Sequence, residues 1–187
     1  MARNTPNARP VKSYAGQAMA LGSLYLATYW IFDGAMLRAP DLLVLSLALS
    51  LIWLSIEDIG HLSFSVGGLC LFSAICLVLL FSLDGDVRMH LLAAMFYGLF
   101  FVALDWLFQR RMGRTALGLG DSVLIAGAGL LLGLSGPIQV ILVASVGALV
   151  WIGGRELLIK GSLRTALPFG PFLAFGIWLT LLEPSLI

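Results

Sequence analysis

The sequence predicts an all-α fold: a bundle of about seven transmembrane helices. Of the 187 residues, 60% are hydrophobic and only 11% are charged, and the mean hydropathy of +1.01 is far above that of a soluble domain. The apolar residues gather in runs of about 15 to 23 residues, separated by short segments with turn-forming residues. This composition indicates an integral protein of the lipid bilayer.

The first three helices are expected at residues 15–32, 41–57 and 64–83. The first follows a polar, basic segment of about fourteen residues and has no small-residue cleavage site, so we expect it to stay in the membrane. The second begins at the end of "LRAPD", and the third lies between "DIGHLS" and "LDGD", which are typical turn sequences.

Four further helices are expected at residues 90–108, 121–135, 137–159 and 168–183. The segment "RRMGRTALGLG" separates the first two of these, and "LSGP" separates the second from the third. The last helix begins at a proline, a residue that is well tolerated in the first turn.

Seven membrane-crossing helices place each loop on one of the two sides of the membrane, and the basic residues are unevenly divided between these sides. With the N-terminus in the cytoplasm, nine basic residues lie on the cytoplasmic side, namely Arg3, Arg9, Lys12, Arg110, Arg111, Arg114, Arg155, Lys160 and Arg164. Only Arg38 and Arg88 lie outside. Short cytoplasmic loops retain positive charge, so we expect an inner-membrane protein with a cytoplasmic N-terminus. Its parts are then a cytoplasmic tail at 1–14, an additional helix and loop at 15–40, and a transmembrane core at 41–187.

Nucleic acid, metal ions and other cofactors are not expected as partners. A formal net charge of +1 provides no basic face for nucleic acid. Cys70 and Cys76 lie six residues apart in one apolar run, and His61 and His90 show no ligand spacing. We therefore interpret the cysteines as packing residues.

Two aspartates are expected at the same depth in the membrane if all seven helices cross it. Asp58 follows the second expected helix and Asp121 begins the fifth, and both helix ends face the cytoplasm. Two close carboxylates tend to share a proton, which leaves one as a base that activates water and the other as an acid. This is the chemistry of aspartic peptidases. The helix-end dipoles predict Asp121 as the base and Asp58 as the acid.

The stretch "GLGDSVLIAGAGLLLG" resembles the GxGD signature of intramembrane aspartyl proteases, in which the aspartate opens a helix after a glycine turn. Within that group, "SIEDIGHLSFS", the GxGD stretch and "LPFGPFLAFGIWL" most resemble the type IV prepilin peptidases. The resemblance covers roughly residues 41–183. It implies an aspartic endopeptidase that cleaves the leader peptide from prepilins or pseudopilins for type IV pili or secretion, with Asp58 and Asp121 as the catalytic residues.

Glycines and prolines near these aspartates are candidates for contacting the substrate. Gly118 and Gly120 permit unusual dihedrals and the close approach of another segment. Pro168, Gly170 and Pro171 form a backbone that cannot be regularly paired throughout, which is suited to holding an extended substrate. A simple helix start is the alternative interpretation.

The sequence departs from the pattern of the family at two places. Ser65 and Val66 stand where many members have Pro followed by Asp or Asn, and Val123 replaces a common lysine. We expect these changes to affect substrate preference more than the chemistry of the two aspartates. The bifunctional members of the family also carry paired CxxC motifs and an N-methylating activity. This chain has no CxxC motif, so the resemblance does not imply a methylating activity for it.

Two other functions are open from the residues alone. In a proton-coupled transporter, Asp58, Asp105 and Asp121 would form a relay, although no inverted repeat is visible. A catalytically inactive relative would act as a partner in pilus assembly. Within the peptidase interpretation, Asp105 is predicted to snorkel or to be paired near the end of its helix. Glu57 is predicted to be a solvated boundary charge, and His61 to lie in a loop.

Overall fold

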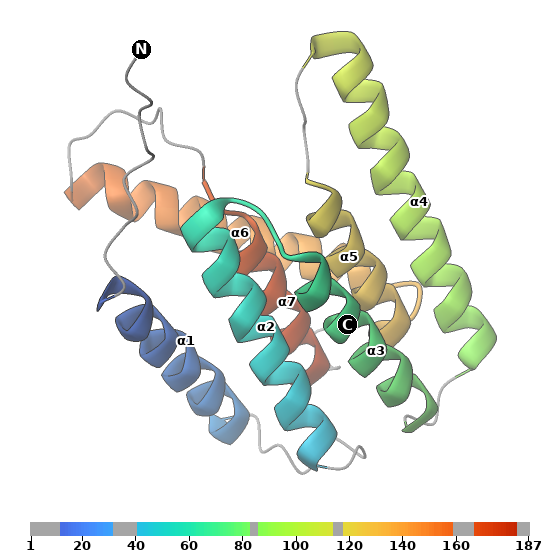
Figure 1. Cartoon of the computed structure of the whole chain (residues 1–187), viewed down its shortest axis with the longest axis horizontal. Coiled ribbons are helices and arrows are strands. Elements are labelled where there is room, and N and C mark those ends of the chain that lie inside the picture. Colours follow the sequence, from blue (N-terminus) through green and yellow to red (C-terminus); the bar gives the residue numbers. More distant parts are fainter. Residues whose placement is uncertain (1–11, 32–40, 83–85, 114–117, 159–166, 183–187) are drawn as a thin grey trace, which may run out of the picture.

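A computed structural model of the chain describes residues 12–31, 41–82, 86–113, 118–158 and 167–182 (Figure 1). These residues form the helices α1 (Lys12–Ile31), α2 (Asp41–His61), α3 (Val66–Ser82), α4 (Val87–Met112), α5 (Leu119–Leu132), α6 (Gly136–Leu158) and α7 (Gly170–Leu182). The prediction of an all-α bundle of about seven helices is confirmed, and each expected window overlaps one helix. α1 begins inside the segment predicted as a tail, and the rest of that tail lies outside the described residues.

The two shortest helices form the centre of the bundle. α5 packs against α3, α4, α6 and α7, whereas α7 packs against α1, α2, α5 and α6. Both helices bury about half or more of their residues. At ~1.5 Å per residue, the 14 residues of α5 span about 21 Å, less than the ~30 Å hydrocarbon layer of a bilayer. Other helices rather than lipid therefore surround most of α5 and α7.

The longer helices lie at the periphery. Within the described ranges, three helical segments are long and apolar enough to cross a membrane: Leu42–His61, Val87–Met112 and Gly136–Gly154. The middle one, α4, exposes large apolar side chains such as Leu99, which is 66% exposed. Exposed apolar side chains on long helices are what lipid contact requires, so the chain is a membrane protein. That each of the seven helices crosses the membrane remains a prediction.

Small residues allow the central helices to approach their neighbours closely. A Cβ on Gly129 of α5 would lie 2.8 Å from the backbone nitrogen of Ala94 on α4. A Cβ on Gly176 of α7 would lie 2.8 Å from the carbonyl oxygen of Val140 on α6. Close backbone contacts at small residues are a common means of helix association in membranes, where lipid reduces the hydrophobic driving force.

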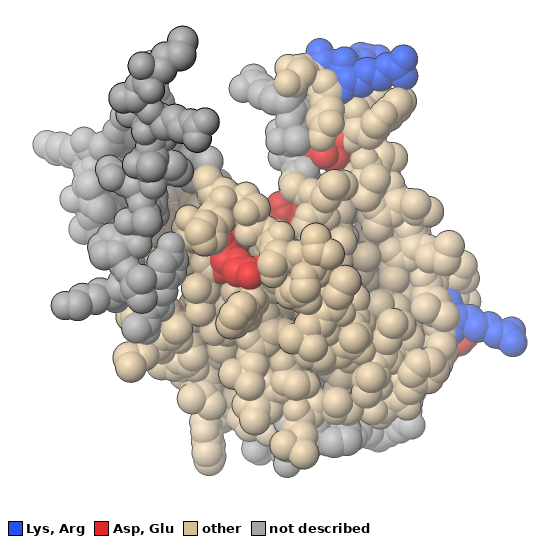
Figure 2. All heavy atoms as spheres, in the orientation of Figure 1, with Lys and Arg blue, Asp and Glu red and all other residues tan. Residues whose placement is uncertain are grey.

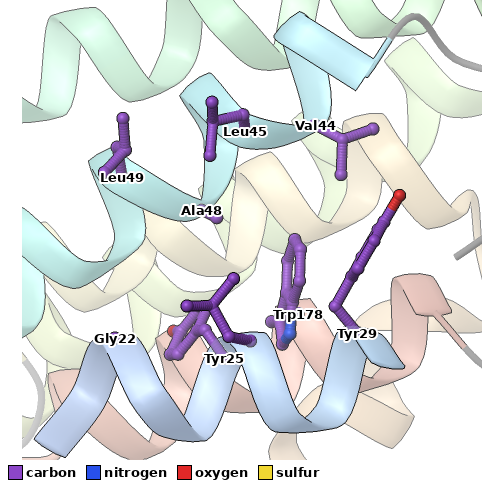
Figure 3. A pocket seen from close by; sticks show the side chains of 9 residues that line it. Gly22, Tyr25, Tyr29, Val44, Leu45, Ala48, Leu49 and Trp178 are labelled. Atoms are coloured by element: carbon purple, nitrogen blue, oxygen red, sulfur yellow. The ribbon is translucent and has the colours of Figure 1, made fainter. Parts of the chain in front are cut away.

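Aromatic side chains join α1 to the bundle. Tyr25 stacks on Trp178 of α7 with ring centroids 5.3 Å apart, and the indole Nε1 of Trp178 donates a hydrogen bond to Thr28 Oγ1 at 2.9 Å. Beside these rings, an apolar cavity of about 440 Å³ extends to the first half of α2 (Figure 3). The cavity residues of α2 precede Asp58 by more than two turns, so this cavity is separate from the predicted site.

α2 is one turn longer than predicted. The helix continues from residue 57 to His61, and the N–H of Leu62 donates to the carbonyl oxygen of Asp58 at 2.8 Å. His61 is therefore the last helical residue and not a loop residue, although its side chain is exposed. The helix ends where Leu62 adopts a positive φ of 53°, which reverses the chain toward α3.

Candidate active site

The end of α2 and the beginnings of α3, α5 and α7 lie at the same end of the bundle (Figure 1). Asp58 lies in the last turn of α2, Asp121 lies in the first turn of α5, and Gly170 is the first residue of α7. Gly120, the residue before Asp121, and Gly170, whose N–H binds Asp58, both lie against the ring of Phe64. Residues that are far apart in the sequence are thus brought to one region, as the sequence predicted.

Asp58 is held by the beginning of α7. Its side chain is buried, with 6% exposed, and its Oδ2 accepts a hydrogen bond from the N–H of Gly170 at 2.8 Å. The first N–H groups of a helix have no partner within the helix, so the carboxylate satisfies one of them. A Cβ at residue 170 would lie 2.8 Å from Oδ2 of Asp58 and would overlap the ring of Phe64. Glycine is therefore needed here for space.

The segment around Gly170 forms a regular helix start. The N–H groups of Phe172 and Leu173 both donate to the carbonyl oxygen of Phe169 at 3.1 Å. Pro171 lies in the first turn, where its missing N–H removes no helical hydrogen bond. The sequence allows two interpretations of this segment, a backbone that holds substrate and a simple helix start, and the structure favours the helix start. A contact of Pro168, Gly170 and Pro171 with substrate remains a prediction.

Asp121 occupies the third position of α5. Its Oδ2 accepts a hydrogen bond from the N–H of Gly118, the residue that precedes the helix, at 3.3 Å. An acidic side chain at this position commonly fixes the helix start by such a contact. Its Oδ1 is buried and has no hydrogen-bond partner within the part of the chain that the structure describes. One oxygen of Asp121 therefore remains available to accept a proton.

The two glycines of the GxGD motif have different surroundings. Gly118 has ordinary extended dihedrals, with φ −70° and ψ 148°, so the expected unusual dihedral is wrong at this residue. At Gly120, by contrast, a Cβ would overlap the ring of Phe64. The expected close approach is confirmed at Gly120, and the approaching segment belongs to the same chain.

Glu57 lies at an exposed boundary, as predicted, and it also closes the loop between α2 and α3. Its carboxylate accepts hydrogen bonds from both the N–H and the Oγ–H of Ser65, each at 2.9 Å. Ser65 Oγ in turn accepts the N–H of Gly68 at 3.1 Å and so caps the beginning of α3. The departure from the family at Ser65 therefore has a structural role. A serine directly before an apolar run was the available signal for this cap.

Asp105 is more deeply buried than its place near the end of α4 suggested. It is 2% exposed, and its Oδ2 accepts a hydrogen bond from Gln109 Nε2 at 2.9 Å. The predicted pairing is thus confirmed. The neighbouring Arg110 lies over the ring of Trp106, with its guanidinium carbon 5.2 Å from the centroid.

Charges are separated at this end of the molecule. Acidic side chains lie along a hollow between the end of α4 and the rest of the bundle (Figure 2). Basic side chains gather at the end of α4, where Arg110 and Arg111 form part of the last turn. Arg88 lies near the opposite end of the same helix. The acidic side chains that the structure describes here thus lie apart from the positive charge at the end of α4.

These features define a class of protein: a helical membrane protein in which main-chain N–H groups hold two carboxylates at neighbouring helix ends. Comparisons with known proteins identify the particular relatives. The chain is 35% identical to the prepilin leader peptidase/N-methyltransferase of Burkholderia pseudomallei (strain 1026b) over 170 residues, which are 89% of this chain and 52% of that protein. The chain is therefore a relative of the prepilin leader peptidases, and the resemblance found in its motifs is confirmed.

Two further relatives carry the same name over shorter regions. The chain is 43% identical to the protein of Xanthomonas campestris pv. campestris over 75 residues, 39% of this chain and 25% of that protein. It is 38% identical to the protein of Aeromonas hydrophila over 81 residues, 43% of this chain and 28% of that protein. The chain thus spans about half the length of the Burkholderia pseudomallei protein. No family model and no solved structure matches it.

Proposed function

We propose that this chain is a membrane aspartyl endopeptidase that removes the leader peptide from type IV prepilins or related pseudopilins at the cytoplasmic membrane boundary. The observation that carries the proposal is the placement of Asp58 and Asp121 at neighbouring helix ends, where Gly120 and Gly170 both lie against the ring of Phe64. The names of the relatives describe peptidases and not transporters, which favours cleavage over a proton relay.

In the proposed mechanism, Asp58 and Asp121 share one proton, because two nearby carboxylates do not both ionise at low cost. The ionised carboxylate takes a proton from water while the water oxygen attacks the carbonyl carbon of the scissile peptide. The other carboxylate supplies the proton that the leaving nitrogen needs, and the C–N bond breaks.

The structure changes the basis on which acid and base are assigned. Each carboxylate accepts an N–H at a helix start, Asp58 from Gly170 and Asp121 from Gly118. Helix dipoles therefore do not distinguish the two residues. The buried Oδ1 of Asp121 receives no hydrogen bond among the described residues, whereas Asp58 accepts the shorter of the two N–H contacts. A buried oxygen without a donor disfavours the charged form, and this supports Asp121 as the acid and Asp58 as the base.

The substrate would lie with its apolar segment along the bundle and its basic leader in the cytoplasm. Arg110 and Arg111 lie at the end of α4, on the side predicted to be cytoplasmic. Positive charge there repels a basic leader, so recognition would rest on the apolar segment. We place the scissile bond beside the starts of α5 and α7, where Gly118 and Gly120 precede Asp121 and residues 168–171 surround Gly170.

The test is cleavage of a co-expressed prepilin by Asp58→Asn and Asp121→Asn. Both variants should lose cleavage by several orders of magnitude, because each removes the acid or the base. The matched control is Asp86→Asn, since Asp86 caps the opposite end of α4 by accepting the N–H of Arg88 at 3.0 Å. This control should retain cleavage within a few-fold. Full cleavage by either of the first two variants, or intact prepilin with the wild type, would contradict the proposal.

A further inference from the structure

The loop between α2 and α3 carries one aromatic side chain into the site. In the loop of residues 62–65, Phe64 is half-buried and the other three residues are exposed. The ring of Phe64 lies against Gly120 of α5 and Gly170 of α7, so closely that a Cβ on either glycine would overlap it. The ring therefore fills the space between the beginnings of these two helices.

This loop is constrained at both ends. At its beginning, Leu62 has a φ of 53°, the only positive φ of a non-glycine residue within the described ranges. At its end, Ser65 bonds twice to Glu57 and caps α3. An unfavourable backbone conformation persists where the surrounding structure fixes it, and such residues gather at functional sites. The loop is thus built to hold the ring of Phe64 in one place.

We infer that Phe64 is a positioning residue of the proposed peptidase site. Its ring is a spacer that sets how closely the start of α5, with Asp121, approaches the start of α7, which holds Asp58. The Cδ2–Cε2 edge of the ring meets Gly120, the residue directly before Asp121. The adjacent Cζ tip meets Gly170, whose N–H binds Asp58. The inference rests on the proposed function, since positioning matters only if the two carboxylates react together.

A pair of complementary substitutions tests the spacer. Gly120→Ala adds a methyl group where the ring lies, and Phe64→Leu removes volume from the ring side, so the double variant nearly conserves volume. A misplacement of ~1 Å lowers catalysis by up to about 100-fold. We therefore expect kcat to fall about 10- to 100-fold in Gly120→Ala, with KM within about 3-fold, and to recover at least about 10-fold in the double variant. A double variant whose loss equals the product of the single losses would overturn the inference.

The matched control is a second contact between a phenyl ring and a glycine of α5. Gly127 faces the ring of Phe72 on α3, and a Cβ on Gly127 would overlap that ring. This contact lies in the buried core, where no carboxylate takes part. Phe72→Leu and Gly127→Ala should lower the melting temperature and leave kcat of the folded enzyme close to that of the wild type. An equal loss of kcat in both pairs would show that Phe64 acts only through stability.

A geometric readout separates this inference from the proposed function. In a background with Cys70→Ala and Cys76→Ala, cysteines replace Asp58 and Asp121 and are joined by bifunctional thiol reagents of graded length. Phe64→Ala should allow shorter reagents to join them, because the helix starts close over the missing ring. If the same reagent lengths join the two cysteines with and without the ring, the inference that Phe64 is a spacer is overturned. Cleavage by Asp58→Asn would overturn the peptidase proposal alone, whereas the reagent profile would still report on the ring.

Discussion

Replacing Gly170 by alanine perturbs the contact that holds Asp58. The new Cβ would lie 2.8 Å from Oδ2 of Asp58, at least 0.6 Å inside the range of ordinary contacts, which begins at 3.4 Å. It would also overlap the ring of Phe64, so the beginning of α7 must move and its hydrogen bond to Asp58 must lengthen. Overpacking destabilises by about 1–3 kcal/mol, and a hydrogen bond to a charged group contributes about 1.5–3 kcal/mol. We expect Gly170→Ala to destabilise the fold by about 2.5–6 kcal/mol.

The same displacement should reduce cleavage of a prepilin by about 100-fold or more per folded molecule. The assay combines the melting temperature in detergent with the cleavage rate of the folded fraction. Gly67→Ala is the control, because a Cβ on this helical residue meets nothing within 4 Å, and it should keep both values at or above wild type. Wild-type melting and cleavage in Gly170→Ala would refute the reasoning. Lower melting with unchanged cleavage would show that the contact is structural alone.

Three further predictions concern the surroundings of the site. Ser65→Ala removes the cap of α3 and the hydroxyl group that binds Glu57, while the main-chain N–H of residue 65 still binds Glu57. The melting temperature should fall by the equivalent of about 1–2 kcal/mol. An unchanged melting temperature would show that the cap contributes nothing. Asp105→Asn keeps the shape of a buried side chain bonded to Gln109, and cleavage should fall at most a few-fold; abolished cleavage in a folded variant would mean that the site contains three acids. Reporter tags at the N-terminus and in the loop after α4 should be cytoplasmic and a tag at the C-terminus should lie outside, whereas both termini on one side would refute seven crossing helices.

The positions of the helices were predictable because a chain in lipid must satisfy its main-chain hydrogen bonds within each segment. Each apolar run therefore became a helix. The ends were less predictable where polar residues continue a helix. α2 extends through Asp58 to His61 because Asp58 is buried against the beginning of α7, and this tertiary contact is not visible in the local sequence.

The site was predictable in its charged residues and not in their contacts. The motif placed Asp121 at a helix start, and the structure agrees. The hydrogen bond between Gly170 and Asp58 joins residues 112 positions apart, so no local pattern reveals it. Phe64 was missed because a single aromatic residue in a short loop carries no periodic signal. The glycines on either side of its ring were noticed, but backbone freedom was the wrong reason for Gly118, and space for the ring is the reason for Gly120.

Asp58 and Asp121 provide acceptors for main-chain N–H groups at two helix starts. The end of α4 projects beyond the beginnings of α5 and α7 (Figure 1). The N–H of Gly170 is buried and would destabilise the fold without an acceptor, which Asp58 provides. The N–H of Gly118 is exposed, and Asp121 accepts it at the start of α5.

Each aspartate thus has a structural role that is separate from catalysis, and the two roles make different demands on the side chain. Asparagine keeps an acceptor oxygen and loses the charge, whereas alanine loses both. We therefore expect Asp58→Asn and Asp121→Asn to lose cleavage and to melt close to the wild type. Both alanine variants should lose cleavage. Asp58→Ala should also lose about 1–3 kcal/mol of stability, because the buried N–H of Gly170 is left without a partner, whereas Asp121→Ala should lose less, because the N–H of Gly118 is exposed. Melting temperatures in detergent measure this difference. Equal melting of the asparagine and alanine variants would show that the two N–H contacts do not stabilise the helix starts.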